Sequence, residues 1–97
     1  MKDLNSMIKE HHKLVVDLKE LMCDLKREHD LTIITNRINL HDNPDVHIFR
    51  GIEKVADALS TPLTFEDRYN ADFPMEKLFV IDDVRYFELC EQEDQYE

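Results

Sequence analysis

The chain has 97 residues, of which 42% are hydrophobic and 35% charged, and its formal net charge is −10. This length and composition are typical of one folded domain and not of a disordered chain. The single glycine excludes the glycine-rich phosphate-binding loops of nucleotide enzymes. No apolar run approaches the roughly 20 residues of a membrane span and no signal-peptide pattern is present, so we expect a cytoplasmic protein.

The excess negative charge lies in the second part of the chain. Residues 1–40 contain seven basic and seven acidic side chains, whereas residues 41–97 contain five basic and fifteen acidic ones and so account for the whole net charge. An acidic surface repels nucleic acid and membranes and attracts basic protein surfaces. We therefore expect a partner protein with a basic surface, and no direct contact with nucleic acid or membrane.

Residues 4–28 are predicted to form one long amphipathic helix with Asp3 as its N-cap. Apolar side chains and one histidine recur at alternating spacings of four and three residues, which is the a/d pattern of a coiled coil. They are Leu4, Ile8, His11, Val15, Leu18, Met22 and Leu25. A third column, formed by Met7, Leu14 and Leu21, widens this stripe beyond a bare two-stranded seam.

Such a stripe either covers the sheet of its own chain or pairs with the same helix of a second copy. The helix would be about 37 Å long at 1.5 Å per residue, whereas a five-residue strand spans roughly 17 Å. Part of the stripe is therefore expected to extend beyond the sheet. A homodimer through this helix is the alternative to packing within the chain.

Beyond the helix, β-branched and aromatic runs alternate with turn residues, and this pattern predicts five strands and a short helix. In chain order the strands are expected at 31–40, 46–50, 63–68, 76–81 and 84–90, and the short helix follows Gly51 and ends at Ser60. We expect an α+β domain spanning 1–97, with a helical arm (1–30), a β-β-α-β-β-β antiparallel sheet with one short helix (31–90) and an acidic tail (91–97).

The last two strands are expected to form a hairpin about a two-residue turn at Asp82 and Asp83. In that register Ile81 faces Val84, and one side of the hairpin carries Phe79 opposite Tyr86 and Lys77 opposite Glu88. The other side carries Leu78, Val80, Arg85, Phe87 and Leu89. Both sides are apolar, so one is expected in the core and the other against a helix, the rest of the domain or a partner.

The turn around Pro44 offers a candidate metal site. His41 and His47 flank this turn, with Asp45 between them. A five-residue loop would pair the two histidines on one face, where they and Asp45 could hold a divalent ion such as zinc. A four-residue loop would place them on opposite faces and remove the site. The main expectation is therefore no cofactor, with a metal as the alternative.

Partner binding is assigned to acidic residues of the second half and to one aromatic side chain among them, because aromatics anchor interfaces. These candidates are Glu66, Asp67, Asp72, Asp82, Asp83, Glu88 and Tyr69. No nucleophile–base pair or cofactor loop is visible, and adjacent carboxylates in turns are usually solvated, so no catalytic residue is assigned.

Two segments, residues 46–59 and 73–89, resemble small uncharacterised acidic proteins of phages and prophages of Gram-positive bacteria. The shared pattern is a strand, Gly51, a short helix, a loop with an aromatic residue and Pro74, and a hairpin that ends in Tyr86-Phe87-Glu88-Leu89. The resemblance covers about half of the chain and carries over no binding or catalytic residue. It implies a context in which small acidic proteins bind and disable host machinery, including CRISPR nucleases and other defence systems.

The leading functional hypothesis is therefore a non-enzymatic, anti-CRISPR-like inhibitor that docks on a basic surface of a host defence nuclease or nucleic-acid-binding protein. The alternatives are a homo-oligomeric structural or assembly protein, joined through the N-terminal helix, and a small metal-binding module.

Overall fold

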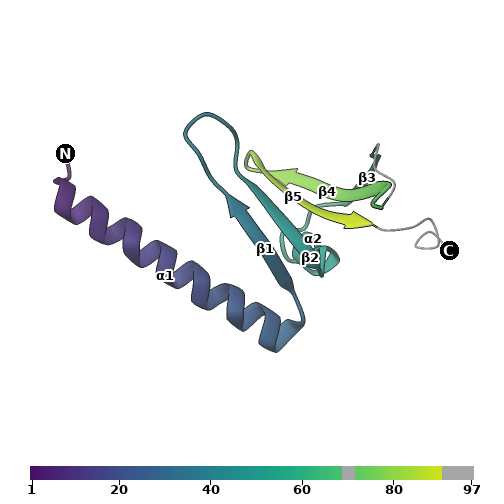
Figure 1. The fold of residues 1–97 in the computed structure, drawn as a ribbon, viewed down its shortest axis with the longest axis horizontal. Coiled ribbons are helices and arrows are strands. Elements are labelled where there is room, and N and C mark those ends of the chain that lie inside the picture. The colour runs from purple at the N-terminus through teal and green to yellow at the C-terminus, as the bar shows by residue number, and fades with distance from the viewer. Residues whose placement is uncertain (69–71, 91–97) are drawn as a thin grey trace.

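The computed structural model of the protein describes residues 1–68 and 72–90. It contains a long helix, a five-stranded sheet and a short helix (Figure 1). The elements are α1 (Leu4–His29), β1 (Thr32–Arg37), β2 (Asp45–Arg50), α2 (Ile52–Ala58), β3 (Thr64–Asp67), β4 (Met75–Ile81) and β5 (Val84–Cys90). The predicted α+β class and the order of the elements are confirmed. The predicted acidic tail, 91–97, lies outside the described residues.

The sheet has the strand order β1-β2-β5-β4-β3 and is mixed. Neighbouring strands are antiparallel except for β2 and β5, which pair in parallel. The expectation of a wholly antiparallel sheet was therefore wrong. The reason is that α2 carries the chain across one face between the β1–β2 pair and the β3–β4–β5 meander, and such a crossover lets the last strand return parallel to β2.

The predicted register of the β4–β5 hairpin is confirmed. Ile81 pairs with Val84, Phe79 with Tyr86 and Lys77 with Glu88. The two turn residues, Asp82 and Asp83, have φ values of 52° and 63°. Positive φ at both central positions is the mark of a type I′ turn, whose twist matches that of the flanking strands.

The core lies between α2 and one face of the sheet. Ile48 of β2 and Ile52 of α2 are fully buried, and Phe79 and Ala56 pack with them. Gly51 starts α2 with a φ of 106°, and a Cβ atom there would lie 2.8 Å from Cδ1 of Leu31. Only glycine combines this backbone conformation with so close a neighbour.

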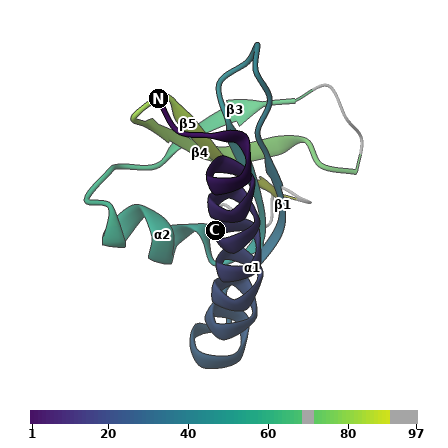
Figure 2. The same ribbon diagram turned by 90° about the vertical axis from the view of Figure 1, so that its left-hand side faces the viewer.

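Helix α1 begins at the predicted N-cap, where an Asp3 carboxylate oxygen accepts a hydrogen bond of 2.7 Å from the Ser6 amide. From its C-terminal end beside β1 it runs away from the sheet (Figures 1 and 2). Leu25 packs against the core, and the side-chain amide nitrogen of Asn36 lies 3.1 Å from the Met22 sulfur. No residue of α1 is buried, so the interpretation in which α1 covers the sheet holds only for its last two turns.

Among the residues that the structure describes, neither helix combines the length and the apolar character that crossing a bilayer requires.

Candidate interaction surfaces

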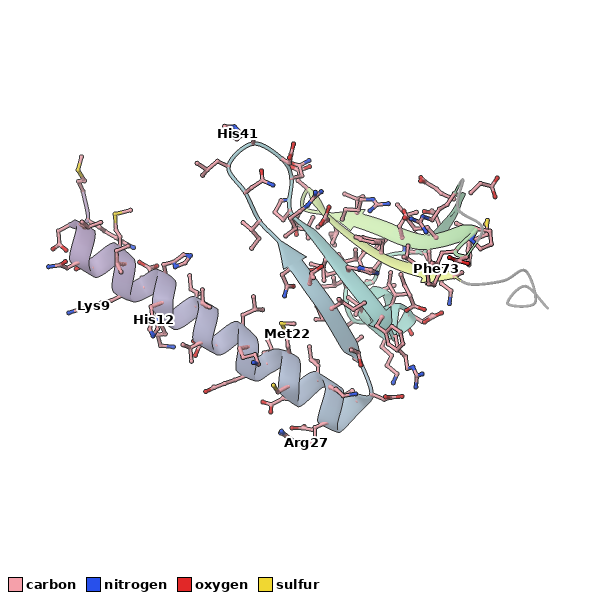
Figure 3. The ribbon with its side chains drawn as sticks, viewed as in Figure 1. Lys9, His12, Met22, Arg27, His41 and Phe73 are labelled. Carbon is pink, nitrogen blue, oxygen red and sulfur yellow. The ribbon has the colours of Figure 1, made fainter. Side chains whose placement is uncertain are left out.

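The α1 stripe, defined as the ten residues of the three predicted columns, is a largely exposed apolar surface. Leu4 is 71% exposed, Ile8 58% and Leu14 61%. Of the seven residues assigned to oligomerisation, five are exposed (Leu4, Ile8, His11, Val15 and Leu18) and two are half-buried (Met22 and Leu25). Figure 3 shows Met22 on the side of α1 that faces β1, whereas Lys9 and Arg27 lie on the opposite side. The stripe therefore remains uncovered over most of its length.

An apolar cavity opens where α1 ends. Its volume is about 540 Å³, comparable to a small-ligand pocket. Its walls come from the end of α1, the sheet and α2, and include Leu25, Leu31, Val55, Leu59 and Tyr86. We call it the base cavity. The spacing of these residues along the chain did not predict the base cavity, because the cavity forms only where α1 and α2 pack on the same face of the sheet.

Two of the predicted acidic positions lie at the same end of the sheet as the β1–β2 loop, which carries one further aspartate. The amide of Arg85 donates a hydrogen bond of 3.0 Å to the Pro44 carbonyl, which brings the β1–β2 loop beside the β4–β5 turn. Asp42 in the loop and Asp82 and Asp83 in the turn are exposed at this end. We call these three residues the acidic end. The signal that was missed is Asp42, which joins the turn only through the parallel β2–β5 pairing.

The basic side chains next to the acidic end are already neutralised. Arg37 forms an ion pair of 2.5 Å with Asp45, and Arg85 pairs with Glu76. Glu76 also lies 3.8 Å from Arg68 and is buried beneath these arginines. The three exposed carboxylates of the acidic end therefore keep an uncompensated negative field.

The other predicted partner-binding residues lie elsewhere. Glu66 and Asp67 are on β3, paired with Glu76 and Met75 at the start of β4. The acidic end follows the far end of β4, about 20 Å away at 3.3 Å per residue. Asp72 lies in the loop that leads to β4, and Tyr69 lies outside the described residues. The structure thus separates the predicted set into distant groups instead of one face.

Glu88 faces Lys77 as predicted, but the sequence did not indicate its contact with α2. Its carboxylate accepts a hydrogen bond of 3.1 Å from the amide of Ile52, at the first turn of α2. The ammonium of Lys77 pairs with Glu53 and lies 3.9 Å from Glu88. Burial raises the pKa of Glu88, and the Ile52 amide and the charge of Lys77 only partly oppose this effect. Burial opposes the charged form of Lys77, yet Glu53 and Glu88 together raise the pKa of this lysine.

A second groove, of mixed polar and apolar character, includes the face of the sheet opposite α2. It has a volume of about 410 Å³, and its lining combines apolar side chains such as Phe49 and Leu89 with the charged Arg50 and Glu88. His47 stacks on Phe87 with 4.6 Å between the ring centroids, and burial together with the charge of Arg68 lowers the pKa of this histidine. This is the second apolar side of the hairpin, which remains partly open.

The structure does not bring the predicted metal ligands together. β1 ends at Arg37, which pairs with Asp45, so the loop spans 38–44 and neither of the two expected loop lengths occurs. His47 lies opposite Thr35, and Figure 3 places His41 at the tip of the loop. Within residues 1–68 and 72–90, no three histidine, cysteine, aspartate or glutamate side chains are grouped closely enough to hold a metal ion.

Comparisons with protein-family models, curated proteins and solved structures found no match to this chain.

Proposed function

We propose that this protein is a non-enzymatic binding factor that docks its acidic end on a basic surface of a partner protein. The observation that carries the proposal is the set of three exposed, unpaired carboxylates, Asp42, Asp82 and Asp83, beside arginines that are already neutralised. Acting as an inhibitor of the phage and prophage type, the protein would occupy a nucleic-acid-binding surface of a host defence nuclease, such as a CRISPR nuclease, in the bacterial cytoplasm.

The electrostatics support binding to a basic surface. Exposed carboxylates on one end of a small domain attract the same lysine and arginine side chains that hold nucleic-acid phosphates. Such attraction raises association rates and is screened by salt over about 8 Å at physiological ionic strength. The proposed complex should therefore form fastest at low ionic strength.

The chemistry of the titratable groups favours binding over catalysis. The partly buried carboxylates in the described part of the chain serve ion pairs and helix α2: Glu76 pairs with Arg85, and Glu88 accepts from the Ile52 amide. Cys90 is buried, and burial raises the pKa of its thiol, so it is held in the protonated, weakly nucleophilic form. None of these groups is arranged as a nucleophile beside a base.

The test uses a matched pair of double variants. Asp82→Asn with Asp83→Asn removes two charges from the acidic end, and asparagine tolerates the positive φ of this turn. Glu66→Gln with Asp67→Asn removes two charges from the distant strand β3. Tagged protein is used to capture partners from a lysate of Gram-positive bacteria, and inhibition is measured as cleavage of target DNA by a purified CRISPR nuclease.

The expected result is salt-sensitive capture of a basic, nucleic-acid-binding protein that the first double variant loses and the second retains. Capture that is equal for the two double variants would refute the assignment to the acidic end. Failure to retain any basic partner at low salt would refute the proposed function itself.

A further inference from the structure

We propose that two copies of this chain pair through their α1 stripes in antiparallel orientation, and that the first turns of each α1 cover the base cavity of the other copy. The occupant of the bare stripe is thus a second copy of this chain. The inference depends on α1 and the base cavity alone, so it can fail or succeed independently of the acidic end.

The surface area of the chain is the first argument. The usual scaling gives about 5,800 Å² for a compact monomer of this size, whereas this chain exposes 7639 Å². The difference is about 1,800 Å², and even half of it would match the roughly 800 Å² that each partner contributes to a standard interface. The apolar side chains of α1 contribute to this excess, because none of them is buried within the chain.

The heptad pattern also favours pairing between copies. Ile8, Val15 and Met22 take a positions, whereas Leu4, His11, Leu18 and Leu25 take d positions. Exposure of such an apolar stripe to water is unfavourable, and pairing of two α1 helices would bury both stripes. The opposite face carries exposed charges, including the ion pair of 2.6 Å between Lys13 and Asp17, and so remains solvated.

The third apolar column decides the orientation. Met7, Leu14 and Leu21 occupy g positions, whereas Lys19 and Lys26 occupy e positions. In a parallel pair each g residue lies beside an e residue of the other helix, which would place Leu14 against Lys19. In an antiparallel pair g lies beside g, so Leu14 meets Leu21 of the second copy and the apolar column is buried. The helix dipoles also oppose each other favourably in this arrangement.

Full overlap of the two 26-residue helices sets Leu4 opposite His29 of the second copy. Ile8 then lies opposite Leu25 of that copy, and His11 lies opposite its Met22. The side-chain amide of Asn36 donates to the Met22 sulfur, which is a weak acceptor. It would lie beside His11 of the second copy and offer that histidine a polar partner. A parallel pair would instead stack His11 on the same residue of the other chain.

The base cavity supports the same register. Leu25 is both a d residue of the stripe and part of the cavity wall. Antiparallel overlap therefore brings Leu4, Met7 and Ile8 of the second copy to the mouth of the cavity. These exposed apolar side chains would displace water from a space that one copy leaves open.

The oligomeric state is measured first, by sedimentation equilibrium of the full chain at tens of micromolar. The expected result is a dimer. Leu14→Glu should raise the dissociation constant at least about a hundredfold, because it removes two buried leucines per dimer. Lys13→Glu, which introduces the same residue on the charged face, should leave the dimer intact. A strictly monomeric protein, or equal effects of the two substitutions, would overturn the proposal.

The orientation is tested by disulfide cross-linking in a Cys23→Ser background. In the antiparallel pair the two copies of residue 8 are about 25 Å apart at 1.5 Å per residue, so Ile8→Cys should not cross-link to itself. Mixing Ile8→Cys with Leu25→Cys should yield a heterodimer, and mixing His11→Cys with Met22→Cys gives a second pair should either variant fold poorly. Efficient self-cross-linking of Ile8→Cys would show a parallel pair and reject the proposed orientation.

Discussion

At the scale of single residues, the cluster of Lys77, Glu88 and Glu53 stabilises the packing of α2 on the sheet. Lys77 and Glu88 lie directly opposite each other on β4 and β5, and Glu53 reaches Lys77 from α2. Gly51, at the N-cap of α2, has no side chain to accept the first amides of the helix. Glu88 supplies this acceptor from a distant strand, so its negative charge stabilises the start of α2.

The raised pKa of Glu88 predicts a pH effect. A carboxyl group whose pKa is higher in the folded than in the unfolded state gains protons on folding, so its contribution to stability grows as the pH falls. Glu88→Gln removes this titration and keeps an oxygen that accepts from the Ile52 amide. The free energy of unfolding of the variant minus that of the wild type should therefore be larger at pH 7 than at a pH near 4.5, the ordinary pKa of glutamate.

Urea unfolding of both proteins over this pH range measures the effect. Glu66→Gln, on the exposed strand β3, removes the same charge without the buried contacts and should show a smaller change between the two pH values. A Glu88→Gln variant whose disadvantage grows as the pH rises would contradict the assignment.

At the scale of elements, local patterns predicted most of the structure. The alternation on either side of Asp82 and Asp83 was sufficient to set the β4–β5 register, because a two-residue turn leaves only one pairing. The β1–β2 loop is longer than the turn predicted around Pro44, because β1 already ends at Arg37. Within this loop the Asn39 side chain accepts hydrogen bonds from the amides of His41 and Asp42, at 2.9 and 2.8 Å, and so forms an Asx turn directly after β1.

Features that depend on distant pairing could not be read locally. The parallel β2–β5 contact follows from the path of α2 over the sheet, and no run of side chains in either strand encodes it. The acidic end depends on that contact, so the sequence assigned Asp82 and Asp83 to an interface without adding Asp42. The base cavity likewise depends on contacts between elements that are distant in the sequence, so local patterns could not predict it.

The β4–β5 turn gives a prediction at this scale. Asp83 has a φ of 63°, which costs less for glycine than for any other residue. Asp83→Gly should therefore raise the free energy of unfolding by about 0.5–1 kcal/mol, whereas Asp83→Ala should lower it. Both variants lose the same charge, so chemical denaturation of the pair isolates the backbone term. A glycine variant no more stable than the alanine variant would show that this turn is not type I′ in solution.

At the scale of the whole molecule, the chain is too extended for its length. Its radius of gyration is 15.9 Å, whereas a compact domain of this length has about 12.5 Å. The difference arises where α1 leaves the sheet (Figure 1). A domain this small buries a modest core, here built around Ile48 and Ile52, so covering the stripe and the base cavity would add substantially to its stability.

Coupling between dimerisation and folding gives the last prediction. If each copy covers the other, the folded dimer is favoured by mass action, and the melting temperature should rise by about 4 °C for each tenfold increase in protein concentration. Differential scanning calorimetry between micromolar and hundreds of micromolar protein measures this dependence. Leu14→Glu should lower the melting temperature at high concentration and remove the dependence, whereas Lys13→Glu should keep it. A wild-type melting temperature independent of concentration would mean that the sheet, α2 and the last turns of α1 fold without the second copy.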